Sequence, residues 1–152
     1  LDIQMKTIGA GHRDTSDTLI AIGRCIDQLK NKEGSEAIFE SARDCYDQGR
    51  HADSLQLWEQ TLKIDIKAKG EEHDDMLLTM NNIMASMNEL KRFKEALAMG
   101  QRALAIRLRV SGDEHQNTIK LMARMANSLG GLGRCKEALE MHLKVSEVRS
   151  RM

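Results

Sequence analysis

The sequence contains no proline, and its aromatic residues are one Trp, one Tyr and two Phe among 152 residues. Residues that favour β-strands are correspondingly scarce, whereas residues with good helix propensity are common. A hydrophobic content of 41% is enough for a packed core, so the composition argues against a disordered chain. These two scarcities predict an all-α chain.

The sequence also lacks an excess of charge of either sign, with 23 basic and 23 acidic residues. Strong binding to nucleic acid or to an anionic membrane requires a basic excess, so neither is expected as a partner. No apolar run approaches the roughly 18 residues of a membrane span, so we expect no membrane insertion. The chain starts at Leu1 without an initiator Met or a signal peptide, which predicts a piece of a longer protein.

Cysteine is rare, with only Cys25, Cys45 and Cys135, and no two of them are close in sequence. An odd number at these spacings argues against a disulfide framework and against a zinc knuckle. Reduced, mostly buried thiols in a reducing compartment such as the cytoplasm are expected.

What the sequence does contain is a repeat with a period of 42 residues. Gly-Glu-Glu-His at 70–73 returns as Gly-Asp-Glu-His at 112–115, and phrases that begin at Arg50, Arg92 and Arg134 keep the same step. A fixed period of a few dozen residues indicates an array of supersecondary units that bury their apolar faces against one another.

Each unit has the apolar pattern of two amphipathic helices. In the second unit the first helix breaks at Lys91, and the second helix ends near Gly112, because glycine is favoured just past a helix. In the third unit the break is predicted at Gly130–Gly133, the most flexible of the turns. Small residues open each second helix and allow close packing: Ser54, Ala96 and Ala138. The apolar positions of the second helices are Leu97, Gly100, Leu104, Ile106 and Leu108, then Leu139, Leu143, Val145 and Val148.

The front of the chain does not fit the period cleanly, because it contains about one helix more than the period requires. Helices are expected near 14–31, 34–48 and 50–69. Residues 14–48 are either a divergent repeat or contain an inserted helix, and the sequence leaves both alternatives open. We expect one array over 1–152, divided into the tail of a preceding repeat (1–12), a first repeat with an extra helix (13–69), a second repeat (70–111) and a third repeat (112–152). Further repeats or a partner would cover its ends.

These units resemble the tetratricopeptide repeat (TPR) in the 42-residue form of kinesin light chains. The matching residues are Gly70, His73, Asn81, Asn82, Arg92, Phe93, Glu95, Ala96 and Ala103, then Gly112, His115, Thr118, Arg134, Glu137 and Ala138. The proline expected after each His is replaced, by Arg13, Asp74 and Gln116, and Met84 occupies a site that is usually small. The resemblance implies a right-handed α-solenoid of antiparallel helix pairs with about seven helices. It also implies that the first helices line a concave groove.

The polar positions that would face this groove are the candidate peptide-binding residues. They are Asn81, Asn82, Asn88, Lys120, Arg124 and Asn127. Asn amides both donate to and accept from a peptide backbone, and Lys and Arg bind carboxylates. Asn82, Lys120 and Arg124 resemble part of the carboxylate clamp of chaperone-binding TPR proteins. The remaining clamp positions hold Phe39 and Arg43 in place of the Lys and Asn of that family. The alternative is that all these residues are ordinary solvated positions.

Two other sets of residues have a structural explanation. His12, His73 and His115 each occupy the same place in a different repeat, so successive ones should lie about one repeat apart in space, too far to share a zinc ion. We therefore expect hydrogen bonds in the loops between units and no metal site. Met80, Met84, Met87, Met122 and Met125 lie at helical spacing, which favours a place in the core over a place on a binding surface.

No nucleophile elbow, phosphate loop or paired zinc motif is present, so we expect neither an enzyme nor a bound cofactor. The leading hypothesis is a non-catalytic adaptor that holds a peptide or helix of a partner protein in the groove. The alternative is a permanent architectural subunit of a large assembly, held through other faces. Both predict a protein as the partner.

Overall fold

The computed structural model describes residues 33–152, and regular secondary structure in this range is helical. The chain divides into two compact units, Leu1–Gly34 and Ser35–Met152. Residues 33–47 are helical, and five further helices follow: α3 (His51–Lys69), α4 (Asp74–Glu89), α5 (Phe93–Ser111), α6 (Gln116–Gly131) and α7 (Cys135–Arg151). The predicted helix near 14–31, His12, Arg13 and Cys25 lie outside the described residues.

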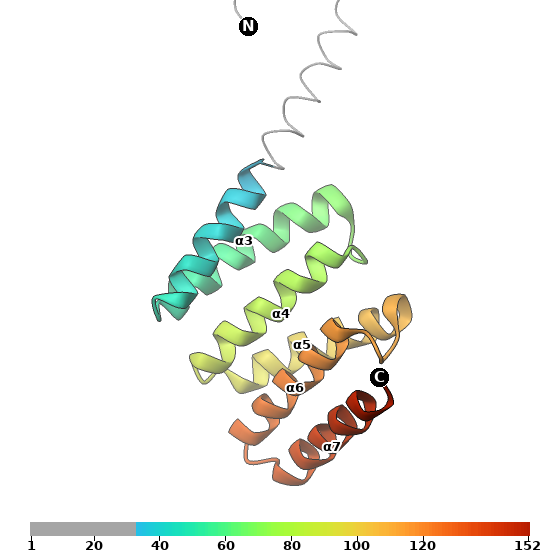
Figure 1. Ribbon diagram of the computed structural model, residues 1–152. Helices are drawn as coiled ribbons and strands as arrows, with labels where there is room; N and C mark the ends of the chain where they lie inside the picture. The colour runs from blue at the N-terminus through green and yellow to red at the C-terminus, as the bar shows by residue number, and fades with distance from the viewer. Residues whose placement is uncertain (1–32) are drawn as a thin grey trace, which may run out of the picture. The chain divides into compact units, whose positions relative to one another are not determined.

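The helices of the second unit stack in sequence order (Figure 1). Each of α4, α5 and α6 packs against the helix before it and the helix after it, and α4 also contacts α6. The chain therefore alternates between two rows of antiparallel helices. We call the 33–47 helix, α4 and α6 the first-helix row; it faces the viewer in Figure 1, with α3 and α5 behind it.

The 33–47 helix follows the same 42-residue register as the later units. A shift of 42 places it on residues 75–89, within one residue of α4, and a second shift places it on 117–131, within α6. Its contacts agree with this register: Ser35 Oγ donates a 2.7 Å hydrogen bond to Asp65 in α3, and the rings of Phe39 and Trp58 lie 6.5 Å apart. This helix is therefore the partner of α3. An extra helix before it stays a prediction.

The turns repeat with the same period as the helices. Gly70 and Gly112 follow α3 and α5 with φ of 87° and 76°, and Gly49, Lys91 and Gly133 follow the first helices with φ of 78°, 60° and 74°. The predicted break at Lys91 is confirmed. Lys91 is the only non-glycine residue with positive φ among residues 33–152, so it adopts a left-handed conformation that favours glycine.

The break predicted at Gly130–Gly133 is wrong in its position, because α6 continues through Gly131. A Cβ on Gly131 would lie 2.5 Å from the ring of Phe93, whereas a Cβ on Gly130 would meet nothing within 4 Å. Gly131 thus allows an aromatic ring of α5 to lie directly on the end of α6, and the turn begins only at Leu132.

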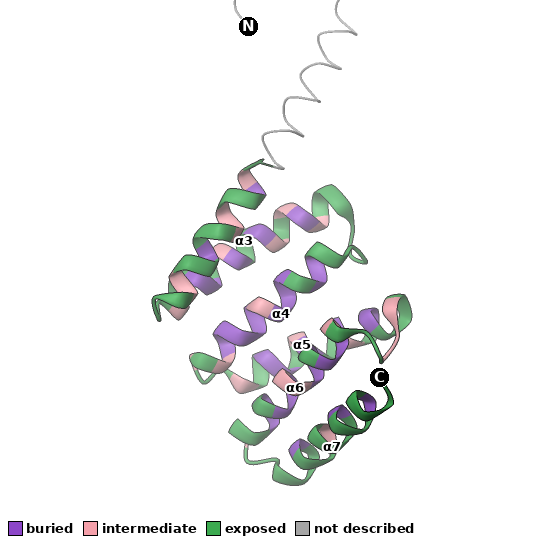
Figure 2. Ribbon diagram, in the orientation of Figure 1, coloured by how far each residue is buried: buried purple, intermediate pink, exposed green. Residues whose placement is uncertain are grey.

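The predicted methionine core is confirmed, since Met80, Met84, Met87, Met122 and Met125 are all at least 95% buried. The small residues allow the predicted close packing: Ser54 and Ala96 are fully buried, and the hydroxyls of Ser54 and Ser86 are 2.9 Å apart. Figure 2 shows the buried residues concentrated along α4. Helix α4 therefore lies at the centre of the core.

The apolar pattern of the second helices is not buried throughout. Leu139 and Leu143 on α7 are each 60% exposed, and Leu108 on α5 is 39% exposed. The main contacts of helix α7 are with α6, and α7 buries Ala138, Val145 and Val148. Leu139 and Leu143 project from its opposite side. Their predicted place in the apolar face that packs against α6 is therefore wrong.

Two recurrent histidines cap helices. Nδ1 of His73 accepts a 3.2 Å hydrogen bond from the backbone N–H of Asp75, and Nδ1 of His115 accepts one of the same length from Asn117. Each side chain thereby satisfies an N–H in the first turn of α4 or α6. The predicted hydrogen-bonding role of these two residues is confirmed.

Candidate protein-binding groove

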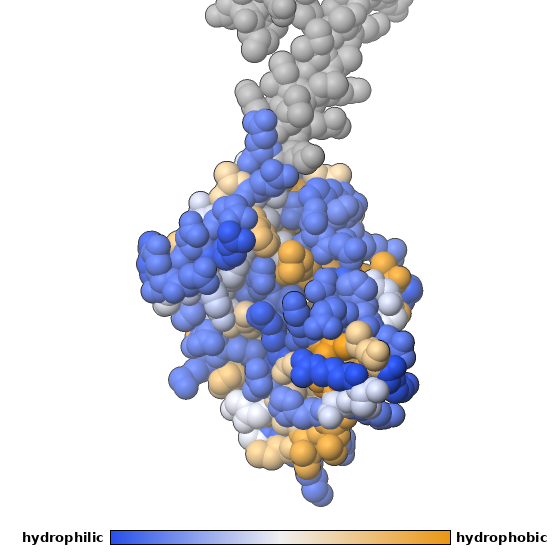
Figure 3. All heavy atoms as spheres, in the orientation of Figure 1, coloured by the Kyte–Doolittle hydropathy of each residue, from blue (hydrophilic) through white to orange (hydrophobic). Residues whose placement is uncertain are grey.

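The outer surface of the first-helix row is built from positions that recur every 42 residues. Residues three or four apart share a face of a helix, so each helix contributes one stripe of four positions to this surface. The equivalent positions are Glu36, Leu78 and Lys120; Glu40, Asn82 and Arg124; Arg43, Ala85 and Asn127; and Asp47, Glu89 and Gly131, and of these only Ala85 is buried. Figure 3 shows mostly hydrophilic atoms over this face, with a few apolar atoms among them.

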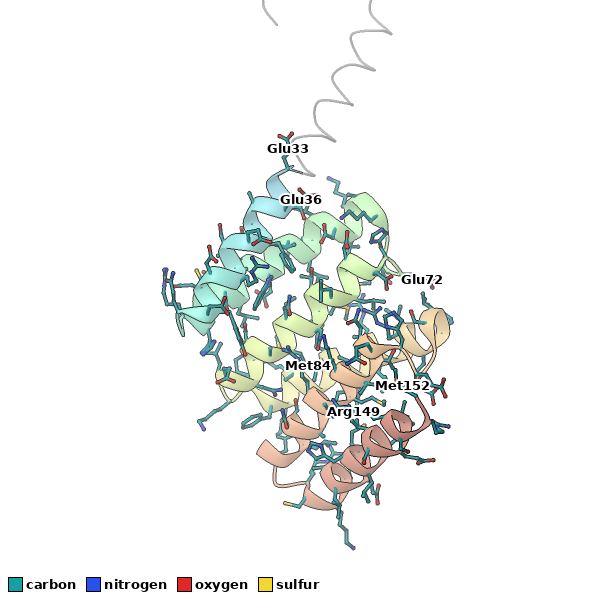
Figure 4. All side chains as sticks on the ribbon, in the orientation of Figure 1. Glu33, Glu36, Glu72, Met84, Arg149 and Met152 are labelled. Carbon is teal, nitrogen blue, oxygen red and sulfur yellow. The ribbon has the colours of Figure 1, made fainter. Side chains whose placement is uncertain are left out.

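A cavity of about 210 Å³ opens between the 33–47 helix, α3 and α4. Its lining combines carboxylates with apolar side chains, and consists of Ser35, Glu36, Phe39, Glu40, Thr61, Asp65, Lys69, Asp75, Leu78 and Thr79. Three positions of the surface stripes, Glu36, Glu40 and Leu78, therefore border the cavity as well. Figure 4 shows Glu36 near the beginning of the described part of its helix.

Charged groups in the lining of this cavity hold one another in place. Asp65 is only 3% exposed and accepts the hydrogen bond from Ser35, while Lys69 Nζ lies 2.5 Å from Asp75 Oδ2 and 3.8 Å from Asp65 Oδ1. The hydrogen bond to Asp75 raises the pKa of Lys69. The ammonium group thus stays charged and bridges α3 to the first turn of α4.

Three of the six predicted binding residues keep accessible side chains on the row. Lys120 and Asn127 are exposed on α6, and Asn82 is half-buried on α4. No ion pair involves Lys120 within residues 33–152. These three side chains are available to a ligand.

The other three predicted residues have roles within the array. Asn88 Nδ2 donates to the Arg124 carbonyl at 3.3 Å, and its Oδ1 accepts a 2.7 Å bond from Ser128. Arg124 Nη1 donates to the carbonyl of Asn81 at 3.2 Å, and burial lowers the pKa of this guanidinium. Asn81 is buried, and its Oδ1 has no hydrogen-bond partner among the described atoms. These groups join α4 to α6.

Aromatic side chains hold the first helix of the row, residues 33–47, against α3. The ring centroids of Tyr46 and Trp58 are 5.6 Å apart, and those of Tyr46 and His51 are 4.8 Å apart in a T-shaped arrangement. Burial raises the pKa of Tyr46, and the nearby carboxylate of Glu89 raises it further. Aromatic contacts of this kind hold the 33–47 helix against α3 and keep its charged stripe in position.

Sequence reasoning missed the cavity, although it named one lining residue, Phe39, as a clamp position. Its lining comes from three helices, and Thr61, Asp65 and Lys69 belong to a second helix, which the groove prediction did not consider. The sequence did contain a signal that could have identified part of the lining. Because the repeat has a period of 42 residues, the candidate Lys120 is equivalent to Leu78 and Glu36, and both of these residues line the cavity.

Other kinds of site have no support in this part of the chain. No group of three His, Cys, Asp or Glu side chains that could hold a metal ion exists within residues 33–152. None of the helices described is both long and apolar enough to cross a membrane. Cys45 is a half-buried free thiol and Cys135 an exposed one, so the predicted burial of these thiols is wrong.

The family profile of the tetratricopeptide repeat matches residues 75–151, which is half of the chain. The chain belongs to the tetratricopeptide repeat family. TPR proteins generally mediate protein–protein interactions, and members of this family are typically non-catalytic. The recognition of 42-residue TPR units from the sequence is therefore confirmed.

Several solved structures share this TPR fold. BtubC (BKLC) from P. vanneervenii matches with a TM-score of 0.72 at 19% identity over 78% of this chain. The nearly identical TPR-like repeats of a kinesin light chain from Podosopora anserina match with a TM-score of 0.65 at 18% identity, over 99% of this chain and 82% of theirs. A TPR-like protein from Chlorobium tepidum matches with a TM-score of 0.67 at 22% identity, over 81% and 83%.

These likenesses establish the fold alone, and they confirm the predicted right-handed α-solenoid of antiparallel helix pairs. The chain spans 46% of the length of the BtubC structure. No curated protein matches the chain in sequence at a significant level.

Proposed function

We propose that the first-helix row is a groove that holds a segment of a partner protein and catalyses no reaction. The observation that carries this proposal is the cavity of about 210 Å³, which opens along the same row as the accessible side chains of Asn82, Lys120 and Asn127. A mixed apolar and polar concave surface is typical of sites that bind ligands. No cofactor is required.

The contacts available to a ligand are of two kinds. The amides of Asn82 and Asn127 can donate to a peptide carbonyl and accept from a peptide N–H, and Lys120 can pair with a carboxylate. Phe39 and Leu78 offer apolar surface at the cavity for a side chain of the ligand. Arg124 and Asn88 contribute indirectly, because their bonds set how α4 and α6 lie together.

A binding selection with random displayed peptides tests the groove. Enriched peptides are expected to lose about 1–3 kcal/mol of binding free energy in Lys120→Ala, since a charged contact is removed, and to lose affinity in Asn82→Ala as well. Gln101→Ala is the control, because Gln101 is exposed on α5 outside the row. If no peptide is enriched, or if enriched peptides bind both row variants as well as the wild type, the proposal is wrong.

One observation favours the alternative of a permanent architectural subunit. Leu139 and Leu143 form an exposed apolar stripe on α7, and such stripes mark interaction surfaces. A permanent interface through this stripe would be insensitive to salt, whereas a groove that binds charged segments loses affinity as ionic strength rises. A salt-resistant complex that Leu143→Glu disrupts and Lys120→Ala leaves intact would favour the architectural alternative.

A further inference from the structure

The charge of the first-helix row changes sign from one helix to the next. At two of the four sets of equivalent positions, the 33–47 helix has Glu36 and Glu40, α4 has Leu78 and Asn82, and α6 has Lys120 and Arg124. Over whole helices, residues 35–47 contain four acidic residues and one Arg, α4 contains three acidic and no basic residues, and α6 contains two basic residues and no acidic residue. At these two sets of positions, a ligand laid across the row meets acidic, then uncharged, then basic side chains.

We propose that this groove selects a partner segment with segregated charge, basic at one end, apolar in the middle and acidic at the other end. The inference rests on the proposed function and names the chemistry of its ligand. Complementary charge gives an interface specificity and register, because a segment with its charges misplaced juxtaposes like charges.

The acidic end is a shaped pocket. Glu36, Glu40, Asp65 and Asp75 all line the cavity, and Lys69 is the only basic residue among its lining residues. Arg43 pairs with Glu40 at 2.5 Å, but both side chains are more than half exposed, and such pairs contribute little to stability. The pocket therefore keeps a negative excess that fits a Lys or Arg side chain of a ligand, whose aliphatic part can pack against Phe39 and Leu78.

The basic end lies on α6. Lys120 is exposed, and Arg124 is half-buried with its guanidinium bonded to a backbone carbonyl. Neither side chain pairs with a carboxylate in the part of the chain that the structure describes. An acidic side chain of a ligand can therefore pair with Lys120 without displacing an existing ion pair.

The spacing of the helices sets the length of the segment. Packed helices lie about 8–10 Å apart, so two steps along the row separate the acidic and basic ends by roughly 16–20 Å. An extended peptide rises about 3.3 Å per residue, so about five or six residues separate the two charged ends of the segment. The 39% exposed side chain of Leu78 lies between the two ends and favours an apolar residue in the middle.

The test uses two fluorescent peptides of identical composition. One has two Arg at one end, Leu residues in the middle and two Asp at the other end, and the second alternates the same charges. Fluorescence anisotropy should show the segregated peptide binding at least about tenfold tighter, with the difference shrinking at high salt. Glu36→Lys should remove most of this preference. Glu59→Lys is the matched control, because it makes the same charge change on exposed α3 surface outside the row and the cavity lining.

The outcomes separate this inference from the proposed function. If both peptides bind equally and Asn82→Ala weakens both, the groove binds peptides but does not select segregated charge, and the inference is wrong. No binding of the segregated peptide up to about 1 mM also overturns it, whatever the random-peptide selection finds. A preference that Glu59→Lys removes as effectively as Glu36→Lys would place the selectivity outside the row and would equally overturn it.

Discussion

At the scale of single residues, Lys91 is the clearest departure from the repeat, because the equivalent position in the other units is glycine. Its φ of 60° matches the values of Gly49 and Gly133, which occupy the same position in the other units. A side chain makes this conformation costly, so Lys91→Gly should stabilise the protein by about 1 kcal/mol. Urea denaturation measures the change. Gln101→Gly in the middle of α5 is the control and should destabilise by a similar amount; stabilisation by neither or by both would contradict the argument.

Two adjacent glycines should respond in opposite ways to the same substitution. Gly130→Ala places a methyl group in open space on a helix, so it should stabilise by about 0.5–1 kcal/mol. Gly131→Ala forces Phe93 to move, because its Cβ would lie 2.5 Å from the ring, and should destabilise by about 1–3 kcal/mol. Thermal denaturation of the two variants measures both signs. Equal effects would show that Phe93 does not pack on Gly131 in solution.

This pair of glycines also shows what the sequence alone could not predict at this scale. A run of glycines is typical of a turn, and local propensity gives no reason to divide the run. The reason is a tertiary contact, since Phe93 belongs to a different helix. By contrast, the buried methionines followed from helical spacing, which is a local property of the sequence.

At the scale of helices, the caps of α4 and α6 are a repeated feature that can be tested. His115→Ala removes the acceptor for the N–H of Asn117 and should cost about 1 kcal/mol. His115→Asp should restore that stability, because Asp is a preferred N-cap and its charge complements the helix dipole. Urea denaturation of the two variants provides the measurement. If both lose the same stability, the histidine ring acts through packing and its hydrogen bond contributes nothing.

The helices were largely predictable because two features of the sequence indicate each of them: the helical spacing of apolar residues and the 42-residue repeat. The expected helix over 50–69 corresponds to α3, and that over 34–48 to the helix that ends at 47. The candidate site was predictable only in part. Asn88 and Arg124 were read as ligand-binding groups, yet their hydrogen bonds cross between α4 and α6, and nothing in a single helix reveals a partner on another helix.

At the scale of the whole second unit, packing is unequal along the array. Helix α4 contacts α3, α5 and α6 and buries ten of its 16 residues, whereas α7 contacts α6 and buries three of 17. Much of α7 is exposed in Figure 2. Because stability in a repeat array is close to a sum of neighbour interfaces, α7 should open without the rest of the array unfolding.

Hydrogen exchange measured by mass spectrometry should therefore show the slowest exchange in α4 and the fastest in α7. Val148→Ala removes one of the few side chains that hold α7 on α6, so it should speed exchange in α7 while α4 keeps its protection. Met84→Ala is the matched central variant, and should speed exchange in α4, α5 and α6 together, since Met84 is fully buried at the centre of the core. Equal protection of α4 and α7, lost together in both variants, would mean that the unit unfolds as one cooperative body and that its unequal interfaces do not set local stability.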